Sequence, residues 1–252
     1  MRITGKDVEA ITGGTKSSYD LYKALELSDA AHKEIFAYAR KIGMTCFSSV
    51  FDPTGVDILQ KVNSPAIKIA SGDLLYLPLI QKAARLRKPL ILSTGCATFS
   101  EVLYAYEQIS RMTKDFALLH CVSKYPLPPE EANLKIISQW KQILPCPVGF
   151  SDHSEGFALA PLAVALGADI LEKHFTLDNR MEGPDHVLSL NPEDFGSMVK
   201  SIRTVEKALG TSYKMPVSDE WKERINGRRG LKASKNLKAG KKIQEMDIKV
   251  IK

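Results

Sequence analysis

The chain has 252 residues, of which 44% are hydrophobic and 25% are charged, and these values are typical of a folded globular protein rather than a disordered or fibrous one. Its formal net charge is +6 at pH 7, from 35 basic and 29 acidic residues, and the basic residues are scattered along the sequence. Scattered positive charge suits an anionic small substrate as well as nucleic acid. The charge alone therefore does not choose between these two ligand classes.

The sequence shows no pattern of a membrane-spanning or secreted protein. The longest apolar stretches, such as residues 157–166, are far shorter than the roughly 20 residues of a membrane-spanning helix. The first residues lack the apolar core and cleavage signal of a secretory peptide, so we expect a cytoplasmic location. Cys46, Cys96, Cys121 and Cys146 lie far apart, without the close pairs typical of zinc sites, and are interpreted as reduced thiols.

Short apolar runs alternate with longer amphipathic segments between residues 29 and 209, a pattern typical of repeated β/α units. Strands are predicted over residues 44–52, 66–72, 89–95, 116–123, 147–153 and 169–177. Helices are predicted over residues 29–42, 76–86, 100–112, 129–144, 156–166 and 192–209. The strands are almost continuously apolar, which indicates a parallel sheet buried on both faces.

Such a sheet can curl into a barrel or remain open with a doubly wound topology. No glycine-rich phosphate loop follows any predicted strand, which argues against an open dinucleotide-binding sheet. All the predicted strands end in polar residues, and a barrel builds its active site from the ends of many strands. We therefore expect an α/β protein with a (β/α) TIM-type barrel. The barrel should be incomplete, because residues 1–28 contain no apolar run that supplies the strands needed for closure.

The chain is predicted to contain three regions. Residues 1–210 form the barrel, residues 211–226 form a linker with a short helix, and residues 227–252 begin a small β-rich module. This module has strand-like segments on both sides of the turn KAGKK. It ends before it could bury a core of its own.

Two histidines are predicted to share one side of two strands. The two-residue period of a strand places Ser151 with His153, and Glu172 with His174. If these strands are neighbours, the two imidazoles can share a divalent metal, assisted by Glu172 or Asp185 and completed by water or substrate. The alternative is that the histidines are hydrogen-bonded core residues, and their spacing leaves both interpretations open.

A lone lysine, Lys68, lies within the otherwise apolar predicted strand 66–72. A buried ammonium is costly unless it meets an anion, and a substrate phosphate or carboxylate would satisfy it. Serines at the ends of successive strands are candidate donors to the same anion: Ser71, Ser93, Ser123 and Ser151. Each serine alone is better explained as a cap of a helix or turn, but the set together with a buried lysine favours an anion pocket.

Several motifs, in this order and at these intervals, closely resemble the sialic acid (N-acetylneuraminate) synthase family: KIASG, LSTG, HCVSKYP, VGFSDHS, EKHFTLD and GPDH. The resemblance runs from about Tyr19 to the end, and EKHFTLD followed by GPDH is its most specific part. It implies a (β/α) barrel followed by an antifreeze-like (SAF) domain. It also implies a transferase that condenses phosphoenolpyruvate with an N-acetylated sugar aldehyde such as N-acetylmannosamine and releases phosphate.

The resemblance also implies a role for individual residues. His153 and His174 match the ligands of a divalent metal, Mn2+ or Mg2+. The residues that match phosphoenolpyruvate-binding positions are Lys68, Ser71, Ser93, Ser123 and Ser151. Tyr125 and Asp185 match positions on the sugar side, and with Lys68 they are the candidate catalytic residues. Ser49 and Asp73 are candidate substrate-binding residues, although the family usually has threonine and glutamate there.

The resemblance implies further segments at both ends of the family's chains. The family begins with two more strands that carry a glutamate and a lysine, and its C-terminal domain continues to an arginine that reaches the active site of a partner in a homodimer. We therefore expect a truncated chain with little activity of its own, and no nucleic-acid or membrane partner. Two other functions stay open: an inactive scaffold that binds anionic ligands, and another phosphoenolpyruvate-dependent aldol-type synthase, such as a deoxy-sugar-acid phosphate synthase.

Overall fold

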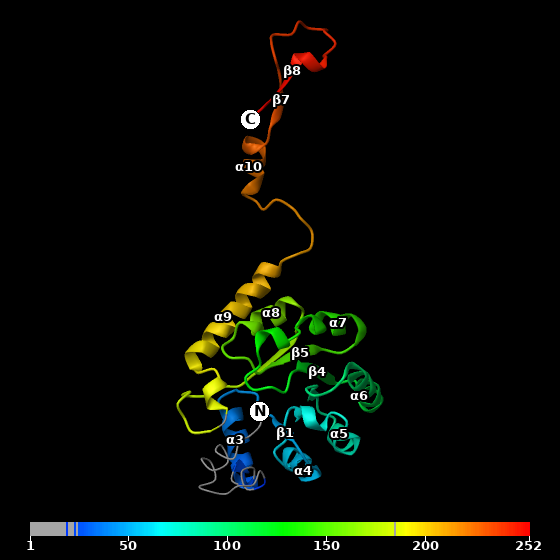
Figure 1. Ribbon diagram of the computed structural model, residues 1–252, viewed down its shortest axis with the longest axis vertical. Helices are drawn as coiled ribbons and strands as arrows, with labels where there is room; N and C mark the ends of the chain where they lie inside the picture. Colours follow the sequence, from blue (N-terminus) through cyan, green and yellow to red (C-terminus); the bar gives the residue numbers. More distant parts are fainter. Residues whose placement is uncertain (1–18, 20–22, 24, 184) are drawn as a thin grey trace. The chain divides into compact units, whose positions relative to one another are not determined.

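A computed structural model describes Tyr19, Lys23, residues 25–183 and residues 185–252 (Figure 1). The chain divides into two compact units, Met1–Leu209 and Gly210–Lys252. Within the described residues, no helix is both long enough and apolar enough to cross a membrane.

The described part of the first unit contains one sheet of six parallel strands. The strands are β1 (Ser48–Val50), β2 (Ile67–Ile69), β3 (Leu90–Ser93), β4 (Phe116–Cys121), β5 (Val148–Asp152) and β6 (Ile170–Lys173). Each strand pairs with the next one in the chain, so the order in space follows the order in sequence. A doubly wound sheet would reverse its order at a switch point, whereas a barrel wall does not. The predicted TIM-type fold, as an incomplete barrel in the described residues, is confirmed.

Helices alternate with these strands (Figure 1). They are α3 (Asp29–Lys41), α4 (Pro53–Lys61), α5 (Leu77–Ala84), α6 (Phe99–Met112), α7 (Lys135–Ile143), α8 (Leu159–Ala165) and α9 (Pro192–Leu209). Short 3-10 turns lie at η1 (Ser71–Asp73), η2 (Pro129–Glu131) and η3 (His186–Leu188). Most predicted helices are confirmed to within a few residues.

Three helix predictions need correction. Helix α4 was missed because its first turn contains Pro53 and Gly55, yet proline is well suited to that turn and Asp52 caps the helix by accepting from Gly55 N at 2.8 Å. The helix predicted over 129–144 is divided into η2 and the shorter α7. Helix α6 begins at Phe99, one residue before the predicted start at Ser100, because Thr98 caps the helix and forms a capping box with Glu101.

The main core lies between the sheet and the helices. Side chains on the helix-facing side of the strands have no exposed surface and pack with the helices: Ile67, Ile69, Leu90, Leu92, Leu118, Val148 and Phe150. Because side chains alternate along a strand, the residues between them point to the other side of the sheet. This inner side carries Lys68, Ser93, Ser151 and Glu172. The helix-facing core therefore holds the strands that position the polar side chains.

The second unit contains α10 (Glu220–Gly227), β7 (Gly230–Ala233), the 3-10 turn η4 (Glu245–Asp247) and β8 (Ile248–Ile251). Strands β7 and β8 pair antiparallel, as expected from the strand-like segments on both sides of the KAGKK turn. Asp247 has no exposed surface and accepts a hydrogen bond from Lys241. Most of α10 lies in the predicted linker, and the assignment of this unit to the antifreeze-like domains stays a prediction.

Candidate active site

Lys68 is the centre of a polar cluster on the inner side of the sheet. Lys68 is only 6% exposed, and its Nζ donates to Ser93 Oγ at 2.7 Å. Glu172 Oε2 lies 3.5 Å from the same Nζ, and Glu172 Oε1 accepts from Ser151 Oγ at 2.7 Å. Residues from β2, β3, β5 and β6 thus meet around one ammonium. Their contacts stabilise the buried charge, and the hydroxyls beside it are suitable donors to an anion.

Gly95, directly after β3 and Thr94, brings two more predicted serines together. Its backbone N–H donates to Ser71 Oγ at 2.9 Å. A Cβ at this position would lie 2.1 Å from Ser123 Oγ and 2.8 Å from Ser71 Oγ. No larger residue fits without displacing these hydroxyls, so the close approach of the two serines depends on glycine. Sequence reasoning did not identify this role, although a glycine that follows a strand of a barrel was a usable signal.

The two predicted metal ligands lie beside each other, just beyond β5 and β6. The ring centroids of His153 and His174 are 5.4 Å apart. His153 Nδ1 lies 2.8 Å from the carbonyl oxygen of Val122, which can only accept, so Nδ1 carries the hydrogen. His153 Nε2 is left with its lone pair and accepts from the Tyr125 hydroxyl at 2.9 Å. The tautomer of His153 is therefore set by the backbone.

Burial keeps both members of this hydrogen bond neutral. It lowers the pKa of His153, because the charged imidazolium is the form that loses hydration. It raises the pKa of Tyr125, because the phenolate is the charged form of that group. The two rings also stack, with centroids 3.9 Å apart. At neutral pH the pair therefore presents a neutral imidazole and a hydroxyl group.

The side chains present fit a divalent metal with two protein ligands. A neutral imidazole nitrogen is the form that binds metals, and His153 Nε2 has that form. Asp185 Oδ2 lies 3.7 Å from His174 Nδ1, so a carboxylate is close to the second imidazole. No group of three or more metal-binding side chains occurs in the residues that the structure describes. Water or substrate would have to supply the other ligands.

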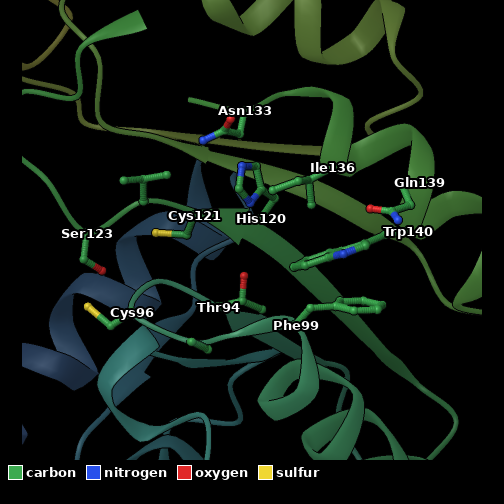
Figure 2. Close-up of a pocket in the computed structure, with 12 residues that line it drawn as sticks. Thr94, Cys96, Phe99, His120, Cys121, Ser123, Asn133, Ile136, Gln139 and Trp140 are labelled. Carbon is green, nitrogen blue, oxygen red and sulfur yellow. The ribbon is translucent and has the colours of Figure 1, made fainter. Parts of the chain in front are cut away.

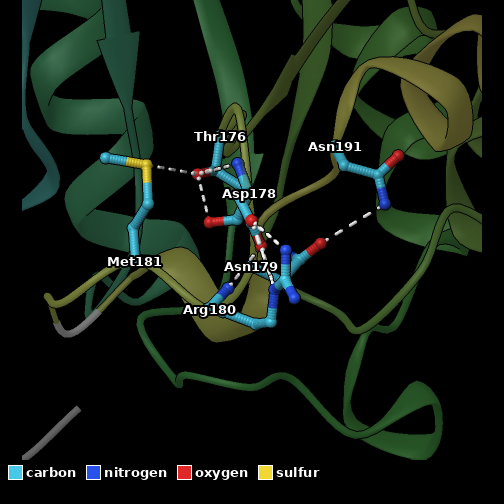
Figure 3. A network of polar contacts seen from close by, with 6 residues as sticks. All are labelled: Thr176, Asp178, Asn179, Arg180, Met181 and Asn191. Carbon is cyan, nitrogen blue, oxygen red and sulfur yellow. Dashed lines mark hydrogen bonds and ion pairs between the residues drawn. The ribbon is translucent and has the colours of Figure 1, made fainter.

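The loop after β6 holds Asp185 close to the histidines, and a polar network holds the loop (Figure 3). Asn179 Nδ2 donates to the carbonyl oxygens of His186 at 2.9 Å and Ser189 at 2.7 Å. Asn191 Nδ2 in turn donates to Asn179 Oδ1 at 3.3 Å. Asn179 therefore holds the η3 turn, which directly follows Asp185.

Two predicted substrate-binding residues, Ser49 and Asp73, take no part in the polar contacts of the cluster. Ser49 is exposed on β1, on the same side of the sheet as its register partner Lys68. Asp73 is half-buried in η1, where burial raises its pKa. Among the described residues, neither side chain forms a hydrogen bond or ion pair with the other predicted site residues.

Glu172 has a different neighbour from the one that the sequence suggested. The sequence placed Glu172 on the side of β6 that it occupies in the structure, but predicted that it assists the two histidines. In the structure its carboxylate contacts Ser151 and Lys68. Strand parity identifies the side of a residue, whereas its contact partner depends on the register between strands.

A cavity of about 510 Å³ adjoins the cluster, between the loop after β3 and helix α7 (Figure 2). Figure 2 shows the rings of Phe99 and Trp140 facing each other, with centroids 6.3 Å apart, and Ser123 at the opposite end. His120 lines the cavity from β4, where it alternates with the inward-facing Cys121. The cavity is therefore largely on the helix side of β4, beside the polar cluster.

The sequence of this chain is similar to those of known proteins. An uncharacterized protein of Methanocaldococcus jannaschii is 48% identical over 223 residues, which cover 88% of this chain and 66% of that protein. The N,N'-diacetyllegionaminic acid synthase of Campylobacter jejuni is 38% identical over 237 residues, which cover 93% of this chain and 71% of that enzyme. This chain thus spans about two thirds of the archaeal relative's length.

A solved structure shows the same arrangement of elements. The N-acetylneuraminic acid (sialic acid) synthetase of Leptospira borgpetersenii matches with a TM-score of 0.79 and 32% identity, over 87% of this chain and 77% of that one. Residues 4–214 match the family described as the NeuB family. With this match over most of its length and a barrel wall that ends in the expected motifs, the chain belongs to the NeuB family.

Proposed function

We propose that the chain carries the phosphoenolpyruvate and metal part of a nonulosonic acid synthase site. The observation that carries the proposal is the buried ammonium of Lys68, which lies on the inner side of the sheet with Ser93 and Ser151 nearby. Buried cations need anionic partners, and its nearest carboxylate, on Glu172, is 3.5 Å away and 40% exposed. An anionic substrate can displace that partner. The names of the relatives, as synthases of legionaminic and sialic acids, support this class of product.

Phosphoenolpyruvate has a phosphate and a carboxylate, and the cluster offers donors for both. Lys68 supplies a point charge, and the hydroxyls of Ser71, Ser93 and Ser123 supply directed hydrogen bonds. The serines come from different strand ends, so they surround the anion rather than contact it from one side. Such a fixed arrangement holds the enol carbon in line with a second substrate.

The second substrate is proposed to be an N-acetylated sugar aldehyde such as N-acetylmannosamine. In the reaction, C3 of phosphoenolpyruvate bonds to the aldehyde carbon, and the aldehyde oxygen takes up a proton and becomes a hydroxyl. Water adds at C2 and gives up its protons, the C2–O bond to phosphate breaks, and the products are a C2 ketone and inorganic phosphate. Tyr125 and Asp185 lie beside the two histidines and can hydrogen-bond the sugar. A divalent cation, Mn2+ or Mg2+, held by His153 and His174 would polarise the aldehyde oxygen as a Lewis acid.

Calorimetry with phosphoenolpyruvate tests the anion site. The Lys68→Met variant removes the buried charge, and we expect it to bind phosphoenolpyruvate at least about tenfold more weakly, since a hydrogen bond to a charged group contributes about 1.5–3 kcal/mol. The matched control is Lys61→Met, which removes an exposed lysine that pairs with Asp29 at 3.3 Å. Equal affinity of the wild type and Lys68→Met would contradict the proposal.

Phosphate release distinguishes the proposed synthase from the two alternatives. Release from phosphoenolpyruvate with N-acetylmannosamine and Mn2+ supports the synthase. Binding of phosphoenolpyruvate without release from any aldehyde, even when the N-terminal segment of a longer relative is supplied, supports the anion-binding scaffold. Release only with a phosphorylated aldose supports a deoxy-sugar-acid phosphate synthase.

A further inference from the structure

A buried ion pair joins β5 to β6 on the face opposite the candidate metal ligands. Lys173 Nζ lies 3.0 Å from Asp152 Oδ2, and the two side chains are 2% and 1% exposed. In sequence, Asp152 directly precedes His153, and Lys173 directly precedes His174. The pair thus lies one residue before each imidazole, on the outer side of the same two strands.

The ion pair also marks the end of the ladder between the two strands. Asp152 and Lys173 are the last register pair of β5 and β6. Beyond it the carbonyl of His153 accepts from Leu127 N, and the carbonyl of His174 accepts from Leu190 N, both at 2.9 Å. The two histidine backbones are therefore bonded to different loops. The ion pair thus lies at the last paired position of the two strands, directly before the point where their backbones separate.

Ser154 completes the network on the far side of His153. Asp152 Oδ1 accepts from Ser154 N at 2.9 Å and from Ser154 Oγ at 2.6 Å. Lys173 Nζ also donates to the carbonyl oxygen of Ser154. The residues before and after His153 are thus both bonded into one network with β6, which restricts the backbone that carries the imidazole.

Stability alone does not explain a buried charged pair at this place. The neighbouring outward positions of the sheet are apolar, including Phe150 of β5. Well-packed apolar residues are often as stabilising as a buried ion pair, because desolvation offsets the attraction. What charged hydrogen bonds provide beyond apolar contacts is one defined geometry.

We propose that Asp152 and Lys173 are positioning residues, which fix the separation and orientation of His153 and His174 so that both imidazoles face one divalent cation. This inference rests on the proposed metal-binding function. Residues that orient metal ligands without touching the metal commonly change its affinity about 10- to 100-fold when they are replaced.

The test compares a double variant, Asp152→Asn with Lys173→Met, with the wild type. The double variant leaves no uncompensated buried charge, so it avoids the large destabilisation of either single change. The matched control is Lys141→Met, which removes a pair with Asp169 at 2.7 Å, directly before the other end of β6. Calorimetry with Mn2+ gives the affinity. Nuclear magnetic resonance of the metal-free protein with labelled histidine and tyrosine rings shows whether the His153 ring contacts the rings of Tyr125 and His174.

We expect the double variant to bind Mn2+ at least about tenfold more weakly, with loss of these ring contacts. The Lys141→Met control should stay within about twofold of the wild type, because half-exposed pairs contribute little. A folded double variant with wild-type affinity and unchanged ring contacts overturns the proposal. If the double variant does not fold, Ser154→Ala takes its place, and unchanged affinity and ring contacts there overturn the proposal equally.

The result also separates this inference from the proposed function. If the wild type does not bind Mn2+, the proposed metal site is wrong, and the ring contacts alone decide the positioning role. Their loss in the double variant then supports the role, and their persistence overturns it.

Discussion

Replacing Gly95 by alanine tests the serine arrangement with a single methyl group. The new Cβ would lie 2.1 Å from Ser123 Oγ, 2.8 Å from Ser71 Oγ and 3.2 Å from Cys121 Sγ. Contacts this short require the neighbouring groups to move. The backbone at Gly95 is not in the left-handed region, so alanine adds no backbone strain there. The effect of the substitution therefore comes from the displaced side chains.

The size of the effect follows from these contacts. Overpacking of a well-packed region costs about 1–3 kcal/mol, and we expect a loss of stability in that range. A hydrogen bond to a charged group contributes about 1.5–3 kcal/mol, so displacement of both hydroxyls should weaken phosphoenolpyruvate binding by about 3 kcal/mol or more. That change corresponds to a factor of about 100 or more in the dissociation constant.

Two measurements check the Gly95→Ala prediction: calorimetry with phosphoenolpyruvate and unfolding in urea. The matched control is Gly72→Ala in the neighbouring turn, where an added Cβ meets no atom within 4 Å. Combining Gly95→Ala with Ser123→Gly removes the shortest contact and should restore stability but not full binding. Wild-type stability and affinity in Gly95→Ala would refute the reasoning, because the hydroxyls would then be free to move without consequence.

Three further predictions follow from the described contacts. Glu172→Gln should strengthen phosphoenolpyruvate binding several-fold in calorimetry without metal, because a carboxylate 3.5 Å from Lys68 no longer competes with the anion; weaker binding would contradict this. Burial lowers the pKa of His120 from 6.5, so below that pH the unfolded state binds more protons than the folded state and stability falls as the pH decreases. Urea unfolding between about pH 7.5 and 5.5 should show this slope, at most about 1.4 kcal/mol per pH unit for this group, and His120→Asn should reduce it. Thr98→Ala removes the capping box of α6 and should cost about 1 kcal/mol in the same assay, whereas Ser100→Ala should have little effect.

Local sequence patterns predicted most of the regular elements because those patterns act over neighbouring residues. The segment 192–209 matches α9 at both ends, since Pro192 starts a helix well and the apolar period continues to Leu209. The predicted strands are longer than the observed ones, because an apolar run continues past the last ladder partner. In 66–72, for example, β2 ends at Ile69 and Ser71 already belongs to η1.

Strand parity predicted only part of the candidate site. It placed Ser151 with His153 and Glu172 with His174, each pair on one side of its strand, and the motifs that contain these residues indicated the family. It did not reveal that Glu172 is the carboxylate nearest to Lys68. It also did not reveal that Ser71 contacts Gly95 while Asp73, in the same turn, forms no hydrogen bond or ion pair with the other predicted site residues.

The sequence by itself determined which residues are apolar, which side of each strand they face, and which motifs end the strands. Only the tertiary structure decided which side chains from different strands meet, such as Ser123 with Ser71 at Gly95, or Asp152 with Lys173. The physical reason is that periodicity depends on the geometry of one element, whereas a contact depends on the register and loops that join distant elements. A shift of one residue in that register would keep every local pattern and abolish every one of these contacts.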